Sequence, residues 1–358
     1  MKKIFLSLLI SSTAFAQQLE EVAAFGKNQP IGVAVETTTN RVFVSFPHNE
    51  PFLYALTEII DGKRAPYPDS GWNWYLPKAY DTHFYNVQDI YADDKGYLWV
   101  LDSKPAGAAA LTSTGAAETE GKFKLVKIKL SDNKVEKVYN FGGLDKAKSG
   151  LNDVRVDTSR NLAYLSDPAQ KAIVVLDLAT DKVRLALQND ASTIAHDGYI
   201  LKIDGREMRD ESGKPFSSAV NGIALTKDNK YFYYKPINQD KLYRIATQFL
   251  ADAKLSAEAL SKKVETVASA RVTHGLECDA KGNIYFGHSP GHSIKYVSPD
   301  GKVNTLVKDN RIIWPDSFGV GSNGYLYFSC AQLNRTPKYN NGSDRVQYPY
   351  KVFRVKMP

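Results

Sequence analysis

NDVRVDTSRNLAYLSDP, the stretch from Asn152 to Pro168, decides the fold of this chain. A short apolar strand leads into a polar turn and then into a second strand, which is the pattern of a β-hairpin. Five other stretches repeat it: IGVAVETTTNRVFVSFP from Ile31, QDIYADDKGYLWVLDS from Gln88, NGIALTKDNKYFYYKP from Asn221, HGLECDAKGNIYFGHS from His274 and DSFGVGSNGYLYFSCA from Asp316. One type of hairpin therefore recurs six times along the chain.

Further strands follow most of the hairpins. Third strands are predicted at PFLYAL from Pro51, KLVKIKL from Lys124, AIVVLDL from Ala172, KLYRIAT from Lys241, SIKYVSP from Ser293 and KVFRVKM from Lys351. Weaker fourth strands are predicted at VYNF from Val138, VRLALQ from Val183, VETVASA from Val264 and VNTLVKD from Val303. Antiparallel repeats of this kind, starting 42 to 69 residues apart, are typical of propeller blades.

The two ends of the chain predict how the ring closes. The last repeat has no sequence for an outer strand after Pro358, whereas LEEVAAF, from Leu19, is a spare strand. Pairing the two would leave few exposed strand edges. We therefore predict an all-β fold, a six-bladed β-propeller closed by pairing of the N-terminal strand with the C-terminal blade.

The first residues, MKKIFLSLLISSTAFAQQ, have the pattern of a secretory signal peptide. Lys2 and Lys3 precede a short apolar run, and Ala14-Phe15-Ala16 forms a cleavage site. The apolar run is shorter than the roughly 20 residues that span a bilayer, and no later segment comes closer. We expect a signal peptide over residues 1–16, a single propeller domain over residues 17–358, a secreted or periplasmic location and no membrane span.

The charge is modest and scattered. The formal net charge is +7, and no basic run interleaved with aromatic residues occurs. This argues against nucleic acid as a partner. We expect a monomer whose partner is a small-molecule ligand.

Cys278 and Cys330 are the only cysteines. Both fall in predicted strands of different repeats. They could form a disulfide in an oxidising compartment, or they could be two buried free thiols.

Three stretches depart from the repeat, and long connections of this kind carry function on propeller faces. Residues 62–85 are rich in proline and tryptophan and could pack on the blades or form a ligand wall. Residues 196–218 predict an extra hairpin around Asp204-Gly205, and residues 247–263 predict an amphipathic helical segment.

The repeats also resemble a known family. LNDVRVDTSRNLAYLSDP, followed by IVVLDL, is similar to the core of the major royal jelly/yellow family, as are VQDIYADDKGYLWVLDS, VNGIALTKDNKYFYYKPINQDKLYRIAT and DSFGVGSNGYLYFSCAQLNR. The resemblance covers nearly the whole chain after the leader and implies a six-bladed propeller. It implies less about activity, because members include proteins linked to dopachrome conversion, salivary proteins that bind biogenic amines, and nutritive proteins.

In a propeller the innermost strands line the central channel, so the residues at their starts form a ring near one mouth. These residues are Ile31, Gln88, Asn152, Asn221, His274 and Asp316. All except Ile31 are polar, and we predict that these five form a ligand-binding ring. A polar residue at a strand start can also be a simple turn cap.

The related gluconolactonase and senescence-marker propellers bind a divalent cation at corresponding positions, with two carboxylates and two amides. The present chain departs from that pattern, with Gln29-Pro30-Ile31 in the first repeat and Asn221 where the comparison expects an aspartate. A cation held by neutral amides loses most of its electrostatic stabilisation. No cofactor is therefore expected with confidence; calcium stays possible, with Asn152 and Asn221 as its amide ligands.

His274 and Asp316 are the candidate catalytic residues. A tautomerisation of the dopachrome type needs a base, a proton donor and an aromatic slot, and His274, Asp316 and Asn221 could fill such roles. His274 could instead be a hydrogen-bonded structural histidine. His288 and His292, in the turn HSPGH, are weak candidates for a metal site.

Three functions stay open at this point. The first is binding of an aromatic or polar metabolite at the channel mouth, with or without tautomerase-like turnover. The second is a cation-dependent, lactonase-like hydrolase, and the third is a noncatalytic scaffold for a protein partner. Whether the protein is an enzyme is not decided by its sequence.

Overall fold

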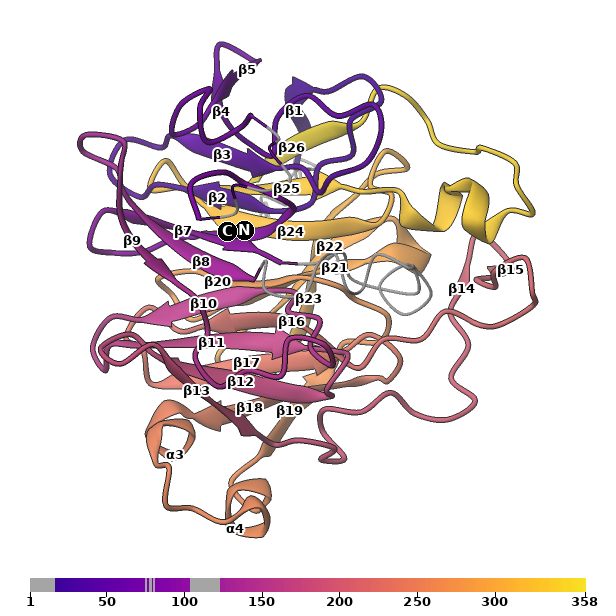
Figure 1. The fold of residues 1–358 in the computed structure, drawn as a ribbon. Helices are drawn as coiled ribbons and strands as arrows, with labels where there is room; N and C mark the ends of the chain where they lie inside the picture. The colour runs from indigo at the N-terminus through magenta and orange to yellow at the C-terminus, as the bar shows by residue number, and fades with distance from the viewer. Residues whose placement is uncertain (1–16, 75, 77–78, 80, 104–122) are drawn as a thin grey trace, which may run out of the picture.

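The computed structural model describes residues 17–74, 76, 79, 81–103 and 123–358. In these residues six antiparallel sheets of four strands each surround a central axis (Figure 1). The predicted all-β, six-bladed propeller is confirmed. The predicted signal peptide, residues 1–16, lies outside the described residues.

Each of the first five blades is built in chain order, from an inner strand beside the axis to an outer strand at the rim. Blade 1 contains β2 (Val33–Val35), β3 (Val42–Ser45), β4 (Leu56–Ile60) and β5 (Lys63–Pro66). Blade 2 contains β6 (Val87–Ala92), β7 (Tyr97–Asp102), β8 (Lys124–Lys129) and β9 (Lys134–Tyr139). Blade 3 contains β10 (Val154–Asp157), β11 (Leu162–Asp167), β12 (Ala172–Asp177) and β13 (Lys182–Ala186). Blade 4 contains β16 (Val220–Leu225), β17 (Tyr231–Pro236), β18 (Lys241–Ala246) and β19 (Glu265–Ser269). Blade 5 contains β20 (Leu276–Cys278), β21 (Ile284–His288), β22 (Ser293–Val297) and β23 (Val303–Lys308).

Blade 6 joins the two ends of the chain. Its strands are β24 (Pro315–Val320), β25 (Tyr325–Cys330), β26 (Lys351–Lys356) and, at the rim, β1 (Glu20–Ala24). Glu20 pairs with Arg354 in the antiparallel ladder, and their side chains form an ion pair of 2.7 Å. The predicted closure of the ring by the N-terminal strand is confirmed.

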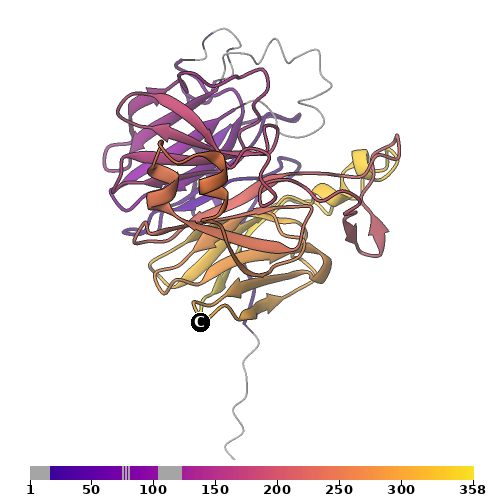
Figure 2. The same ribbon diagram turned by 90° about the horizontal axis from the view of Figure 1, so that it is seen from below.

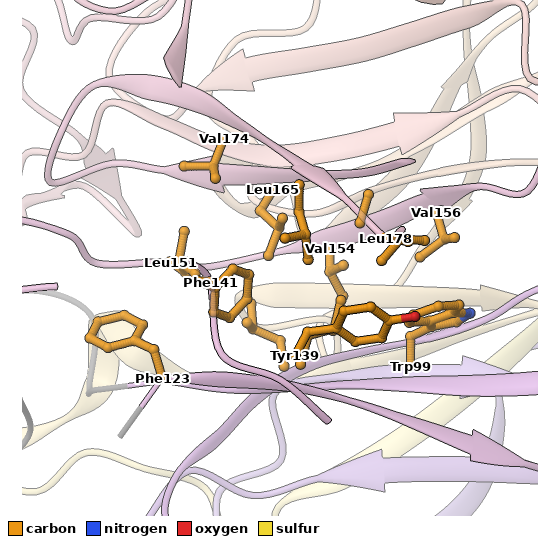
Figure 3. Packing of buried hydrophobic residues seen from close by; sticks show 14 residues of the cluster. Trp99, Phe123, Tyr139, Phe141, Leu151, Val154, Val156, Leu165, Val174 and Leu178 are labelled. Carbon is orange, nitrogen blue, oxygen red and sulfur yellow. The ribbon is translucent and has the colours of Figure 1, made fainter. Parts of the chain in front are cut away.

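The inner strands pack against one another around the axis. Contacts run in the order β2, β6, β10, β16, β20 and β24, and β24 returns to β2. Between the blades lie apolar layers, such as the layer between blades 2 and 3 that contains Trp99, Leu125, Phe141, Val154 and Leu176 (Figure 3). Burial of these layers holds each blade to the next.

The first blade differs from its prediction. Its third strand lies at β4, later in the chain than the predicted segment from Pro51, because residues 46–55 form a loop closed by a hydrogen bond from Phe46 N to Ala55 O. Its fourth strand, β5, was not predicted. The turn Asp61-Gly62, in which both residues have positive φ, is the hairpin signal that marks it.

Two of the other predicted departures are confirmed. The hairpin around Asp204-Gly205 is formed by β14 (Lys202–Ile203) and β15 (Arg206–Glu207), and the helical segment by α3 (Thr247–Ala251) and α4 (Ala257–Ser261). Within residues 62–85, Trp72 and Phe84 pack on an apolar core, whereas Trp74 is 68% exposed. None of the helices in the described residues is long and apolar enough to cross a membrane.

Long connections gather at the end of the channel where the inner strands begin, which we call the mouth. Residues 196–218 and 331–349 lie side by side there and project from the blades; we call them the arm (Figures 1 and 2). The arm has its own apolar cluster, which includes Leu201, Met208 and Tyr339 and extends to Trp314 beside the axis.

The two cysteines do not pair. Cys278 on β20 and Cys330 on β25 are both free and buried. They lie in different apolar clusters, so the structure has two buried thiols where a disulfide was one of two expectations.

Candidate functional site

The predicted ring lies at the mouth of the channel. Gln88, Asn221 and Asp316 each lie at a register shift near the start of an inner strand, and Asn152 and His274 lie two residues before the start of two others. A bulge leaves one residue out of the regular ladder and changes the direction of its side chain. These irregular strand starts thus place polar side chains at the end of the channel, outside the regular ladder.

Serine hydroxyls stabilise this irregular backbone. The hydroxyl oxygens of Ser45, Ser166 and Ser329, at the ends of the second strands, accept hydrogen bonds from the residues that follow the ring positions in blades 1, 3 and 6. These three serines explain the repeated SFP, SDP and SCA at the ends of the hairpins. Each satisfies a buried N–H that the bulged ladder leaves without a carbonyl.

A second layer is formed by the residues that follow the ring positions in sequence: Gly32, Asp89, Asp153, Gly222, Gly275 and Ser317. Side chains of this layer link neighbouring blades: Asp89 Oδ2 accepts a hydrogen bond from Val154 N, and Ser317 Oγ accepts one from Val33 N. We call the ring positions together the cup, and this linked layer its floor.

Glycine is required in the floor where the backbones come closest. A methyl group on Gly222 would lie 1.8 Å from the carbonyl oxygen of His274, and one on Gly275 would lie 1.9 Å from that of Asp316. Blades 4, 5 and 6 thus approach each other backbone to backbone.

One side of the cup is a chain of amides and a carboxyl group. Gln88 Nε2 donates to Asn152 Oδ1 at 3.4 Å, and Asn152 Nδ2 donates to Asp153 Oδ1 at 2.7 Å. The Asp153 carboxyl also accepts a hydrogen bond from the backbone of Ile223 in the next blade. Burial, then repulsion from Asp89 and from Asp316, raises the pKa of Asp153 well above its usual value, although Arg155 acts in the opposite direction.

Asp316 forms the opposite side, since blades 3 and 6 face each other across a six-membered ring. Its Oδ2 accepts a hydrogen bond of 2.9 Å from Trp314 Nε1. Burial raises the pKa of Asp316 to about 7 despite that hydrogen bond, and the nearby Asp89 adds repulsion. Among the described residues no cation offsets Asp316 directly, so near neutral pH this carboxyl can gain or lose a proton.

His274 lies behind the side of the cup that Asp316 and Trp314 form. Its ring stacks on the indole of Trp314 at 3.7 Å, its Nε2 is 2.9 Å from Ser289 Oγ, and only 1% of its surface is exposed. Its Nδ1 has no hydrogen-bond partner among the described residues. Burial and the nearby ammonium of Lys235 lower the pKa of His274 well below its usual value, so the imidazole is neutral at physiological pH.

Lys235 is a buried cation behind the mouth. Its ammonium donates to the carbonyl oxygens of Pro236 and Gln239, with Pro236 O at 2.6 Å. Burial lowers the pKa of Lys235 to about 7. Because these carbonyl oxygens accept its hydrogen bonds, Lys235 fixes the turn after β17. Its charge also disfavours a positive charge on His274.

An ion-pair network extends from the floor residue Asp89 into the channel. Arg155 lies 3.1 Å from Asp89 and 3.6 Å from Glu277, and Glu277 lies 3.1 Å from Lys227. The four residues come from blades 2, 3, 4 and 5, and the Arg155, Asp89 and Glu277 side chains are almost completely buried. Beyond them a cavity of about 20 Å³ is left between β2, β6 and β24, which is room for about one water molecule.

The structure places Gln88, Asn152, Asn221 and Asp316 at the starts of the inner strands and buries the predicted site residue His274 behind Trp314. It also adds groups that the sequence analysis did not name. Asp153 follows Asn152 directly, and its position beside a ring residue was the available signal. The Arg155 network had a weaker signal, namely charged residues inside apolar inner strands such as VRVD and LECD. Trp314 was not singled out from the sequence. Ile31 packs on the arm cluster and contributes no polar group.

The donors at the mouth suit a hard divalent cation in kind. Asp316 at its ring position and Asp153, the residue after Asn152, supply two carboxylates, with amide oxygens on Asn152, Asn221 and Gln88. Calcium prefers such oxygen ligands. Within the described residues, no group of three or more histidine, cysteine, aspartate or glutamate side chains is placed to hold a metal ion.

The weak histidine candidates lie elsewhere. His292 is bound through Nδ1 to Ile312 O at 2.9 Å and through Nε2 to Asp204 at 2.7 Å, which attaches the β14–β15 hairpin of the arm to blade 5. These contacts occupy both ring nitrogens.

The raised pKa of Asp316 predicts how stability depends on pH. The folded protein keeps this proton up to about pH 7, whereas the unfolded chain releases it near its ordinary pKa of 3.8. The free energy of unfolding should therefore fall as the pH rises from about 4 to about 8, by about 2–4 kcal/mol from this group. Denaturation of the wild type and Asp316→Asn across this range measures the effect, because the variant should lose most of the slope.

Asp228→Asn is the matched control, since hydrogen bonds from Thr226 and Lys230 outweigh slight burial and lower the pKa of that exposed carboxyl. It should leave the slope between about pH 5 and about pH 8 unchanged. Equal slopes in the wild type and Asp316→Asn would contradict the assignment.

Comparison with known proteins gives a family and a fold. The family model described as "Major royal jelly protein" matches residues 85–356. No curated protein sequence matches the chain at a significant level.

Solved structures share the propeller fold. A gluconolactonase from Xanthomonas campestris has a TM-score of 0.57 at 11% identity, with 96% of this chain and 90% of that chain covered. A luciferin-regenerating enzyme has a TM-score of 0.56 at 15% identity, covering 95% of each chain. The calcium-binding protein regucalcin from Agrobacterium tumefaciens has a TM-score of 0.55 at 11% identity, covering 96% of each chain. At these identities the similarity concerns the fold alone.

Proposed function

The chain belongs to the major royal jelly protein family, and from this premise we propose that it is an exported protein that binds a small organic cation at the mouth of its propeller. One observation carries the proposal: Asp153 and Asp316 face the cup from opposite blades, with raised pKa values and no cation directly offsetting Asp316 among the described residues. A cationic ligand would supply the missing positive charge.

The ligand chemistry follows from the groups in the cup. An ammonium group would interact with the two carboxylates, and the amides of Gln88, Asn152 and Asn221 would accept or donate hydrogen bonds to polar groups of the ligand. Because a positive charge lowers the pKa of a neighbouring carboxyl, binding would release the proton of Asp316 near neutral pH.

If turnover accompanies binding, Asp316 is the group best suited to transfer a proton. Its pKa of about 7 allows it to act as a base and then as an acid, as a tautomerisation requires. His274 is buried behind Trp314, where its neutral ring can orient the indole by stacking. This assigns the base role to Asp316 and a supporting role to His274.

A matched set of probes tests the binding proposal. Tryptamine and dopamine should raise the melting temperature of the wild type, whereas 3-ethylindole and 4-methylcatechol, which lack the charge, should not. Asp316→Asn should weaken binding of the amines by about tenfold or more in calorimetry, since a hydrogen-bonded ion pair contributes about 1.5–3 kcal/mol.

Asp228→Asn, far from the mouth in an exposed turn, should bind the amines like the wild type. Equal shifts with the amines and their uncharged analogues would reject the organic-cation proposal.

The divalent-cation, lactonase-like function is the second candidate, and the presence of two carboxyls among amide donors favours it. Asp153, Asp316, Asn152 and Asn221 would hold the ion, which would polarise a lactone carbonyl and a bound water. Calcium chloride added to metal-free protein is the probe. A rise in melting temperature that is lost in both Asp153→Asn and Asp316→Asn, together with lactone hydrolysis, would favour this function over amine binding.

Export is proposed from the leader alone. Lys2 and Lys3, the short apolar run and Ala14-Phe15-Ala16 support cleavage after Ala16 and a secreted or periplasmic location. The mass of the protein recovered from its native compartment tests this. A mass that includes residues 1–16 would exclude cleavage.

A further inference from the structure

Trp314 connects the mouth to the arm, and its geometry suggests more than packing. We propose that Trp314 is a positioning residue for Asp316: its Nε1–H, held in place by packing of the indole on His274 and Phe216, fixes the orientation of that carboxyl. The proposal deepens the proposed function, and only the ligand part of its test rests on that function.

The indole is held on several sides. One face stacks on His274 with an interplanar angle of 18°, and the edge of the ring meets Phe216 of the arm at 5.6 Å. Phe216 in turn contacts Tyr339 in the other arm segment. The only polar atom of the side chain, Nε1, donates to Asp316 Oδ2 at 2.9 Å. The N–H therefore has one orientation, directed at the carboxyl.

The backbone of Trp314 is also unusual. Its φ is +50°, in the left-handed region that bulky residues rarely adopt. The carbonyl of Trp314 accepts a hydrogen bond from Ala331 N at 3.0 Å, and the carbonyl of Ile313 accepts one from Gln332 N at 3.3 Å. Strain of this kind persists only where the surroundings impose it, and it is concentrated at functional sites. Here it turns the indole toward a residue only two positions along the chain.

Other charged and titratable groups around Asp316 must be separated from the effect of Trp314. They are Asp89 on β6, Asp153 beside β10, Cys330 on β25 and, behind the indole, His274 and Lys235. Asp89 and Asp153 repel the charged form of Asp316, so Trp314 is the neighbour that donates a hydrogen bond to it.

The test is the titration of Asp316 in protein freed of ligand and of divalent cations. Trp314→Phe keeps an aromatic ring against His274 and removes the N–H. The pH midpoint of Asp316 is obtained from the difference in unfolding free energy between each background and the same background carrying Asp316→Asn. Without its donor, the midpoint should rise by about one pH unit, since a hydrogen bond to a charged group is worth roughly that much. An unchanged midpoint overturns the proposal.

Phe216→Leu is the matched control. It loosens the packing of the arm on the same indole but leaves the N–H in place, so it should lower stability and leave the midpoint within about 0.3 units. If both variants shift the midpoint equally, Trp314 acts only through packing and the positioning role is rejected.

A second measurement needs no Trp314 variant. The chain has four tryptophans, and labelling them with 5-fluorotryptophan gives each a fluorine resonance. One resonance should titrate with the Asp316 midpoint in the wild type and should not do so in Asp316→Asn. Absence of any such resonance would overturn the proposal even where Trp314→Phe fails to fold.

The ligand part is read separately. At neutral pH, Trp314→Phe should bind tryptamine about tenfold more weakly than the wild type, with the loss reduced at higher pH as Asp316 ionises. If the wild type itself binds no amine, the proposed function fails while the titration still decides the role of Trp314. If binding is equally tight in both proteins at neutral pH, the positioning role is overturned.

Discussion

Replacing Gly275 with alanine is expected to prevent folding or to lower the free energy of unfolding by more than about 3 kcal/mol. The added methyl group would lie 1.9 Å from the carbonyl oxygen of Asp316, which is far inside van der Waals contact. Both sides of this contact are backbone, so no flexible side chain can move away to make room for the methyl group. The ring can accept the methyl only if blades 5 and 6 separate, which would break apolar packing and the floor of the cup together.

Chemical denaturation of Gly275→Ala measures this effect. Gly71→Ala is the control, because its methyl would meet only the flexible side chain of Asp69 at 3.1 Å. It should change stability by less than about 0.5 kcal/mol. A Gly275→Ala variant as stable as Gly71→Ala would show that the inner strands are not in close backbone contact.

Arg155→Met is expected to destabilise the protein by about 3–5 kcal/mol. The methionine fills much of the same space, so the loss would come from leaving Asp89 and Glu277 buried without their shared cation. Burial already raises the pKa of Asp89, and removal of Arg155 would take away the largest opposing influence. The loss of stability should be smaller at low pH, where the Asp89 carboxyl can take up a proton.

The matched controls separate charge from packing. Arg209→Met breaks the exposed pair between Arg209 and Glu207 and should cost less than about 1 kcal/mol. Adding Asp89→Asn to Arg155→Met should recover much of the lost stability, because Asp89 then carries no unpaired buried charge, while Glu277 keeps Lys227 as its partner. If Arg155→Met destabilises the protein no more than Arg209→Met does, the role assigned to the network is contradicted.

The propeller could be predicted from the sequence because its information is local and repeated. Each hairpin carries its own apolar alternation and turn, as in the stretch from Asn152 to Pro168, and six copies leave few other arrangements. Closure by Leu19–Phe25 was predictable for the same reason, since one unit lacked a strand and one strand lacked a unit. β5 was missed because its residues also look like a proline-rich loop.

The site was predictable in position but not in composition. The starts of the inner strands mark the mouth, and this rule placed Gln88, Asn152, Asn221 and Asp316 at one end of the channel. The part played by Asp153 depends on contacts with Ile223 and Asp316 in other blades, which no local pattern records. The burial of His274 likewise depends on the left-handed backbone of Trp314, forty residues later in the chain.

Blade 6 has a consequence for how the molecule opens. Its rim strand β1 meets β26 across 334 positions of sequence, as the pair Glu20 and Arg354 shows. So distant a junction has to wait until the intervening blades have formed, which makes it a late step of folding. It is also a natural starting point for unfolding, because the loss of β1 exposes the edge of β26. A strand of a second molecule could then pair with that edge.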